Sequence, residues 1–176
     1  MKQVFILLVC IATLSSCGSK LQYGSKPNYE VIPDDRAKVL RGIIDRNVLE
    51  SDTSFKWFKE NMKYGTADAS AIASFAKNKA KFNVVVFGGT WCEDSQNLLP
   101  VFYRLVDKSG FPENQILLLA ADRKKTTVNN LHEKFKVKNV PTFIIMHDGK
   151  EIGRVVEYGK YAAIDKELGE IVANIQ

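Results

Sequence analysis

The chain has 176 residues, of which 45% are hydrophobic and 26% charged, a composition typical of a folded globular protein rather than a disordered or collagen-like one. At roughly 150 residues per domain, this length predicts one domain with an appendage. The formal charge of +5 is spread along the chain, and the longest basic run is Arg123-Lys124-Lys125, so a nucleic-acid partner is not expected. No apolar run reaches the about 18 residues that a transmembrane helix needs.

The first residues have the pattern of a bacterial export signal. Met1-Lys2-Gln3 carries one positive side chain, and Val4 to Leu14 is apolar but too short to span a bilayer. Leu14-Ser15-Ser16-Cys17 resembles a lipobox, where the chain is cut before a cysteine that receives a lipid. The resemblance implies a lipoprotein signal peptide at 1–16, a lipid anchor on Cys17, and a place in the bacterial cell envelope, on the outer membrane facing the periplasm. An ordinary secretory leader is the alternative.

The cysteine count limits the chain to chemistry that needs a single thiol. Cys10 leaves with the predicted leader and Cys17 is used for lipidation, so Cys92 alone keeps a thiol. An exported chain with one thiol has no internal disulfide. Cys92 is therefore either buried and inert or reactive.

The region before the first expected strand is predicted to be a tether followed by helices. Residues 17–33 are polar, with Gly, Ser, Asn and Pro, and form the expected tether. Residues 34–49 carry apolar side chains at helical spacing, and residues 55–62 form a second expected helix with three aromatic side chains directed to the core. We thus predict a helical extension over 34–66. Its apolar positions are Ala37, Val39, Leu40, Ile43, Ile44, Val48, Phe55, Trp57 and Phe58.

From residue 67 the pattern alternates between helices and strands. Helices are predicted at 67–80, 93–109, 126–135 and 163–175, and strands at 82–87, 115–120, 142–147 and 151–157. Residues 82–87 are a largely β-branched run typical of a strand buried on both faces, and Asp148-Gly149 predicts a hairpin. The fold class is α/β, with a central mixed sheet and flanking helices over 67–176.

Trp91-Cys92-Glu93-Asp94-Ser95 lies where the first of these strands turns into a helix. The free N–H groups and dipole of a helix N-terminus favour a thiolate there, and the thiolate is the nucleophile of disulfide exchange. Glu93 and Asp94 oppose it by charge, although both suit the first helical turn and Thr90-x-x-Glu93 fits a capping box. The sequence leaves the balance of these effects open.

This region resembles the thioredoxin superfamily in three features: the Trp91-Cys92-x-x-Ser95 turn, Pro100 eight residues after the cysteine, and Val140-Pro141-Thr142 before a strand. The resemblance covers 67–176 and implies a thioredoxin-like fold. It also implies a cis Pro141 facing Cys92, backbone pairing of Val140 with a substrate chain, and a docking groove shaped by Trp91.

The sequence departs from the family at several positions. Ser95 replaces the resolving cysteine, and a hydroxyl can only donate a hydrogen bond to the Cys92 thiolate. Val86 stands where the family has a buried acid, and Gly88 where it has an aromatic residue. Gly88-Gly89 either leaves room for a substrate beside Cys92 or lets the turn form.

These features favour thiol–disulfide exchange through Cys92 with protein thiols or disulfides of the cell envelope, completed by an external thiol. Whether this amounts to oxidoreductase or isomerase-type catalysis stays open. The alternative is a non-catalytic binding or assembly module.

The loop at 122–125 either guides a partner or is simply solvated. No cofactor is expected, and no metal, because His132 and His147 are isolated.

Overall fold

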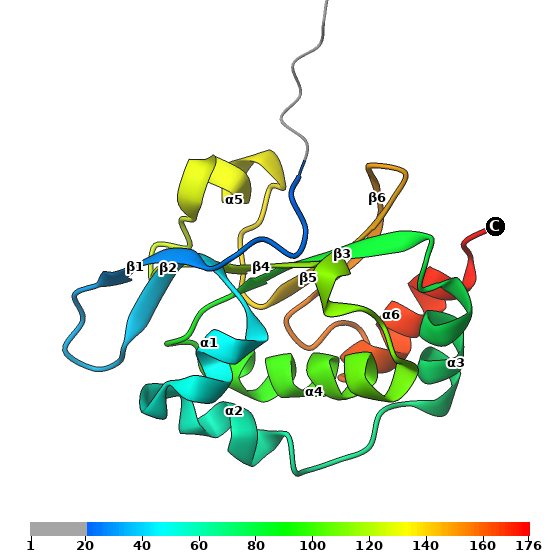
Figure 1. Cartoon of the computed structure of the whole chain (residues 1–176), viewed down its shortest axis with the longest axis horizontal. Coiled ribbons are helices and arrows are strands. Elements are labelled where there is room, and N and C mark those ends of the chain that lie inside the picture. Colours follow the sequence, from blue (N-terminus) through cyan, green and yellow to red (C-terminus); the bar gives the residue numbers. More distant parts are fainter. Residues whose placement is uncertain (1–20) are drawn as a thin grey trace, which may run out of the picture.

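A computed structural model describes residues 21–176. The predicted signal peptide at 1–16, Cys17 and the start of the tether lie outside the described residues. The described part is built around one six-stranded sheet, with helices on both of its faces (Figure 1).

The sheet is mixed, as predicted. β3 (Phe82–Gly88) runs parallel to β4 (Ile116–Ala120) and antiparallel to β5 (Thr142–His147), which pairs in turn with β6 (Lys150–Val156). The strand order is β1-β2-β4-β3-β5-β6. The carboxyl ends of β3 and β4 therefore lie side by side at one edge, where loops can carry a site.

The predicted helix over 34–49 is wrong. Residues there form β2 (Val39–Ile44), which pairs antiparallel with β1 (Asn28–Ile32) and with β4. β1 also shows that the expected tether of 17–33 ends before residue 28. The apolar residues Val39, Leu40, Ile43 and Ile44 have a spacing that suits a helix or a strand equally. However, the backbone of Gly42 has φ +140°, which is incompatible with a helix. The segment forms a strand because β4 offers it free backbone hydrogen-bonding groups along its edge.

Helices cover the two faces of the sheet unequally. Among the α-helices of residues 21–176, five pack on one face, and the short α5 (Leu131–Lys134) lies on the other (Figure 1). The five are α1 (Arg46–Ser51), α2 (Lys56–Asn61), α3 (Ala69–Asn78), α4 (Glu93–Ser109) and α6 (Ile164–Ala173). Asp45 caps α1 by accepting a hydrogen bond from the Val48 amide at 2.9 Å.

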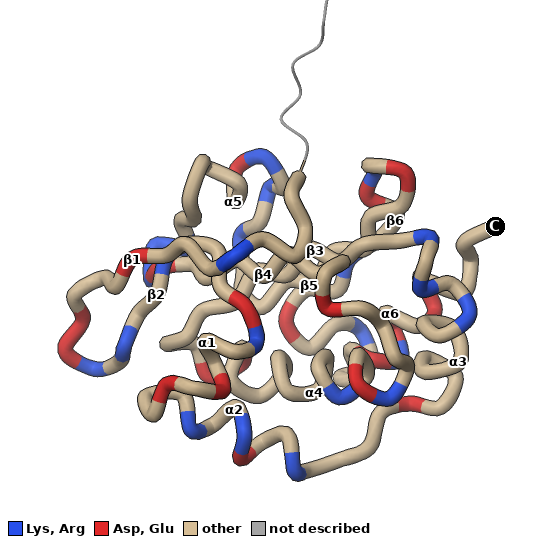
Figure 2. The backbone as a smooth tube through the Cα atoms, viewed as in Figure 1, with Lys and Arg blue, Asp and Glu red and all other residues tan. Residues whose placement is uncertain are grey.

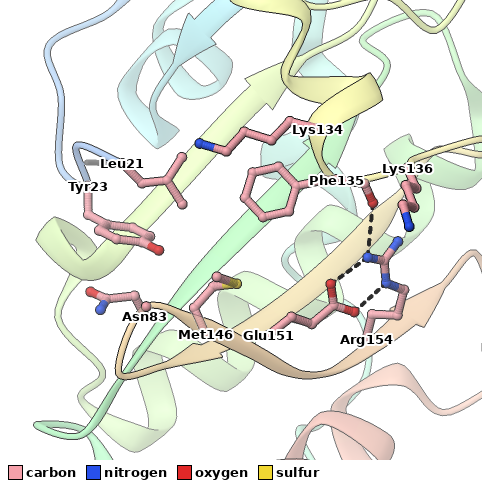
Figure 3. Close-up of a pocket in the computed structure, with 10 residues that line it drawn as sticks. Leu21, Tyr23, Asn83, Lys134, Phe135, Lys136, Met146, Glu151 and Arg154 are labelled. Carbon is pink, nitrogen blue, oxygen red and sulfur yellow. Dashed lines mark hydrogen bonds and ion pairs between the residues drawn. The ribbon is translucent and has the colours of Figure 1, made fainter. Parts of the chain in front are cut away.

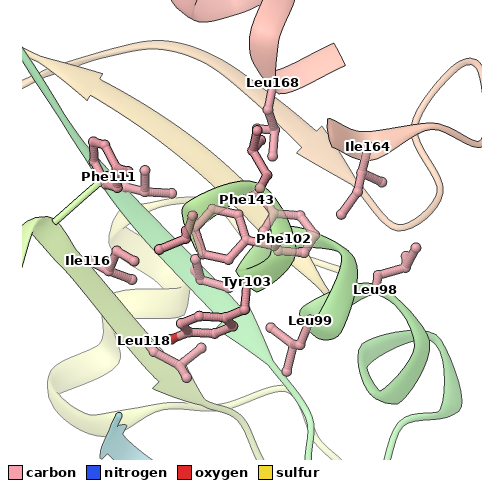
Figure 4. Packing of buried hydrophobic residues seen from close by; sticks show 14 of the residues in the cluster. Leu98, Leu99, Phe102, Tyr103, Phe111, Ile116, Leu118, Phe143, Ile164 and Leu168 are labelled. Atoms are coloured by element: carbon pink, nitrogen blue, oxygen red, sulfur yellow. The ribbon is translucent and has the colours of Figure 1, made fainter. Parts of the chain in front are cut away.

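The core has two parts because β3, β4 and β5 are buried on both faces. Val84 and Val86 face the helix-rich side, whereas Val85 and Phe87 face α5, the alternation that a strand requires. The larger cluster is rich in aromatic side chains, several of which pack around α4 (Figure 4). Phe55 and Phe58 are buried in it, with Trp57 packed against it, as the sequence predicted.

The predicted helix over 126–135 is shorter than expected. Asn129 and Asn130 both have φ +51°, a left-handed conformation that interrupts a helix. Only Leu131–Lys134 form α5, where the Thr127 hydroxyl accepts a hydrogen bond from the His132 amide at 3.1 Å.

Basic and acidic residues are interspersed along the described part of the chain (Figure 2). Within residues 21–176, no helix combines the length and the apolar character needed to cross a membrane.

Candidate functional site

Cys92 lies at the edge of the sheet where β3 passes into α4. It is the N-cap residue of α4, is half-buried, and its thiol donates a hydrogen bond to the Val140 carbonyl at 3.3 Å. The Val140–Pro141 peptide bond is cis, as the resemblance implied. The fold thus brings together three predicted site residues, Cys92, Val140 and Pro141. Cys92 and Val140 lie 48 positions apart in the sequence.

Ser95 has a role different from the expected one. Its side chain is fully buried, and its hydroxyl accepts a hydrogen bond from the Gly89 amide at 3.0 Å. Among the described residues this is its one hydrogen bond, so the predicted bond to the Cys92 sulfur is not made. Ser95 instead fixes the turn that presents Cys92.

The two glycines before the turn allow close packing rather than open space. A Cβ on Gly89 would lie 3.0 Å from the Trp91 indole and 3.1 Å from the Cys92 Cβ. A Cβ on Gly88 would lie 3.1 Å from the side chain of Leu99. The volume beside Cys92 at these positions is therefore occupied by the protein itself.

Trp91 forms a wall next to Cys92. Its indole Nε1 donates to the Ala121 carbonyl at 2.9 Å, just beyond the end of β4. The guanidinium carbon of Arg123 lies 5.0 Å from the centre of its ring, within the range of a cation–π interaction. The loop after β4 therefore contacts the Trp91 indole in two places: Ala121 at the ring nitrogen and Arg123 over the ring face.

The predicted capping box of Thr90 and Glu93 is absent. Thr90 is buried, and its hydroxyl donates to the Lys38 carbonyl at 2.8 Å and accepts from the Leu40 amide at 3.1 Å. Glu93 and Asp94 occupy the first turn of α4, where acidic side chains favour the helix. Thr90 thus binds the turn that carries Cys92 to β2 instead of capping α4.

The loop at 122–125 is more than a solvated turn. Asp122 is only 6% exposed and accepts hydrogen bonds from the Thr126 amide at 2.9 Å, the Thr126 hydroxyl at 2.6 Å and Arg41 at 3.2 Å. Burial by itself would raise the pKa of Asp122, but these bonds outweigh it and hold the pKa below its usual value. Asp122 therefore stays ionised and orders the loop that carries Arg123.

Asp34, which begins the segment predicted to be helical, contacts Arg123. Its carboxylate accepts from the Arg123 Nε at 2.5 Å and Nη2 at 3.0 Å. The hydrogen bonds from Arg123, opposed by partial burial, hold the pKa of Asp34 well below its usual range. Local patterns gave no signal for this pair, because its members lie 89 positions apart.

The other candidate groups have structural roles. His132 Nδ1 accepts from the Thr127 amide at 3.2 Å, and His147 Nδ1 lies 2.6 Å from the Lys81 carbonyl. Val86, at the place of the family's buried acid, is fully buried among apolar side chains. Within residues 21–176, no group of three or more His, Cys, Asp or Glu side chains is arranged to hold a metal ion.

A cavity of about 750 Å³ lies on the α5 side of the sheet and includes none of the predicted site residues (Figure 3). Leu21, Tyr23, Phe135 and Met146 are among its lining residues, and Arg154 pairs with Glu151 at its rim. A second cavity, of about 570 Å³, lies beside Asp34 and Arg123.

Comparison with known proteins identifies a matching family model and several similar chains. The family model described as Thioredoxin matches residues 66–170. Thioredoxin of Mycobacterium tuberculosis is 29% identical over 106 residues, which are 58% of this chain and 87% of that protein. The chain spans only 23% of a longer relative, TPR repeat-containing thioredoxin TDX of Arabidopsis thaliana, at 26% identity over 53% of this chain. Among solved structures, reduced thioredoxin of Schistosoma mansoni has a TM-score of 0.41 at 26% identity, covering 63% of this chain and 95% of that one.

Proposed function

Because this chain belongs to the thioredoxin family, whose model matches residues 66–170, we propose that it is an exported, lipid-anchored protein that performs thiol–disulfide exchange through Cys92 alone. The observation that carries the proposal is the position of the thiol. Cys92 is half-buried at the start of α4, against the cis Val140–Pro141 bond. Among residues 21–176 it is the one free cysteine.

The first step is attack of the Cys92 thiolate on one sulfur of a protein disulfide. A new S–S bond forms between Cys92 and that sulfur, the old S–S bond breaks, and the second client sulfur leaves as a thiolate that takes up a proton. The client disulfide is thereby opened, and Cys92 is held in a mixed disulfide.

Ser95 cannot complete the cycle, since its hydroxyl does not attack a disulfide. An external thiol, or the thiol released on the client, must attack the mixed disulfide. Attack by an external thiol on the Cys92 sulfur releases the reduced client and leaves Cys92 joined to that thiol, and a second external thiol then attacks this disulfide, forms an oxidised thiol dimer and frees Cys92. Attack by the client's own thiol on the client sulfur of the mixed disulfide frees Cys92 and re-forms or rearranges the client disulfide without net oxidation.

The test is to trap mixed disulfides by acid quenching and alkylation of cells that produce the full chain. We expect adducts that a reductant removes and that disappear with Cys92→Ala. Ser95→Ala serves as the matched control, because it alters the same turn and keeps the thiol. Adduct patterns identical in the wild type and Cys92→Ala would overturn the proposal.

The alternative is a non-catalytic module of the cell envelope that binds partners in the same groove. The hydrogen bond from the Cys92 thiol to the Val140 carbonyl favours it, because that bond stabilises the protonated and less nucleophilic sulfur. Partner capture that survives Cys92→Ala would support this reading.

The lipid anchor and the place on the outer membrane facing the periplasm are supported by the lipobox resemblance of residues 14–17. Two or three acyl chains give durable membrane binding, whereas one is marginal. We expect the wild type in the membrane fraction and Cys17→Ala in the soluble periplasmic fraction or unprocessed. Equal membrane recovery and equal processing of both forms would contradict lipidation at Cys17.

A further inference from the structure

The segment that joins β1 to β2 lies against the candidate site although it is outside the part of the chain that matches the family. Its Asp34 carboxylate accepts from the amides of Arg36 and Ala37, both at 3.0 Å. These bonds fix the turn and direct the carboxylate to Arg123, which it binds through two nitrogens. A two-point pair of this kind sets the orientation of the guanidinium plane as well as its position.

The guanidinium so held lies over the Trp91 ring at 5.0 Å, while the indole nitrogen is bound to the Ala121 carbonyl. Trp91 directly precedes Cys92. Its ring has two fixed contacts, one of which depends on a residue from the hairpin. Without Asp34, the Arg123 side chain could adopt other rotamers, and the face of the Trp91 indole would become more exposed to solvent.

A second contact ties the same hairpin to the same turn. The buried Thr90 hydroxyl bridges the Lys38 carbonyl and the Leu40 amide. β2 therefore holds the residue before Trp91, and the β1–β2 segment holds the arginine on top of it. The hairpin is therefore connected to this turn by two separate sets of contacts.

We propose that Asp34 and Arg123 are positioning residues, an ion-pair clip through which the N-terminal hairpin fixes Trp91 as a wall of the docking groove and so sets the reactivity of Cys92 toward protein disulfides. The inference rests on the exchange activity proposed above. The clip acts by geometry rather than by charge, because Asp34 neutralises the guanidinium at close range.

Trp91 fluorescence tests the clip directly. The chain has two tryptophans, and Trp57→Phe leaves Trp91 as the sole reporter. Within residues 21–176 the Trp57 indole nitrogen has no hydrogen-bond partner, so this background loses no such bond. In the full chain, purified in mild detergent, we expect Asp34→Asn and Arg123→Gln each to raise acrylamide quenching of Trp91. An exposed cation–π contact of about 0.5–1 kcal/mol corresponds to an about two- to fivefold rise in uncovered indole.

The two variants also separate geometry from charge. Removing Asp34 makes the site more positive and removing Arg123 makes it more negative, so a charge effect would move the reaction of Cys92 with the anionic disulfide 5,5′-dithiobis(2-nitrobenzoate) in opposite directions. A positioning effect moves it in the same direction in both. We expect both variants to slow mixed-disulfide formation with insulin, the double variant to add little, and Arg123→Lys to restore only part of the effect.

Glu151→Gln is the matched control, since it breaks another two-point carboxylate–arginine pair, with Arg154 on the same strand. It should leave quenching and Cys92 reactivity unchanged. Opposite rate changes in the two clip variants, or quenching equal to that of the control, would overturn the clip. A wild-type Cys92 that reacts with neither disulfide would instead overturn the exchange function, and the quenching data would still report on the clip.

Discussion

At the scale of single residues, the difference between this site and a dithiol site is one atom at position 95. The hydroxyl of Ser95 is buried and accepts a hydrogen bond from the Gly89 amide, so it stabilises the turn and takes no part in the proposed exchange. Cys92 lies one helical turn away, at the N-cap of the same helix. The chemistry of the site is therefore limited by the missing sulfur and not by the backbone.

We predict that Ser95→Cys converts the chain into a self-resolving dithiol protein, because the second thiolate can attack the mixed disulfide within the same turn. Insulin reduction with limiting dithiothreitol should become catalytic and release client without mixed-disulfide build-up. Sulfur accepts the Gly89 amide poorly, so stability should fall by about 0.5–1.5 kcal/mol.

Ser95→Ala is the control for that change. It removes the hydroxyl without adding a thiol, and it leaves the buried Gly89 amide unpaired at a cost of about 1–3 kcal/mol. Persistent mixed disulfides in Ser95→Cys, at the level of Ser95→Ala, would show that the two sulfurs cannot meet.

At the scale of elements, the β1–β2 hairpin is the part that differs most from the expected helical extension. Gly42 lies at its centre, opposite Tyr29 on β1 and Ala120 on β4. A Cβ there would collide with the Asn28 carbonyl and lie 2.6 Å from the Tyr29 Cα. The positive φ and the close approach both require glycine.

Gly42→Ala should therefore loosen the hairpin and lower the free energy of unfolding by about 1–3 kcal/mol, measured by urea titration with tryptophan fluorescence. Because the hairpin carries Asp34 and contacts Thr90, Trp91 should also become easier to quench. Gly149→Ala is the control: it also has positive φ, at +73°, but open space around the added methyl group. Equal losses in the two variants would mean that close packing at Gly42 does not matter.

At the scale of the whole molecule, ionised carboxylates connect segments that lie far apart in sequence. Asp34 binds Arg123, Asp52 binds Lys38, and Asp122 binds Arg41. The pKa of each of these carboxyls is lowered in the folded chain. A folded pKa below the unfolded value means that the unfolded chain takes up protons first, so acid favours unfolding.

The contribution of these carboxylates to stability is thus present above the unfolded pKa of about 3.9 and is lost as the pH falls through the lower folded values. We expect Asp122→Asn to lower the free energy of unfolding at neutral pH by about 1–3 kcal/mol. Below about pH 4 the free energy of unfolding should fall less steeply with pH in this variant than in the wild type. Urea midpoints at neutral and acidic pH measure both effects. Asp35→Asn is the control, because Asp35 is exposed and makes no hydrogen bond or ion pair within residues 21–176. A wild-type acid profile in Asp122→Asn would contradict this role.

The sequence alone determined which edge of the sheet carries Cys92. The apolar runs at 82–87 and 115–120 predict strands buried on both faces, and Cys92 follows the first of them where a helix begins. Local periodicity suffices here, because a strand between two layers and a helix against one layer have different hydrophobic repeats. The family resemblance, rather than local periodicity, implied the cis Pro141 beside Cys92, which the structure has, and a Ser95 bond to the Cys92 sulfur, which it lacks.

Only the tertiary structure decided what the N-terminal region does. The residues at 39–44 suit a helix or a strand, and the open edge of β4 selects the strand by offering backbone hydrogen bonds over a long loop. The same pairing brings Asp34 to Arg123 and Lys38 to Thr90. Such contacts leave no periodic trace in the sequence, because ion pairs and single hydrogen bonds depend on where the sheet places distant residues rather than on their neighbours along the chain.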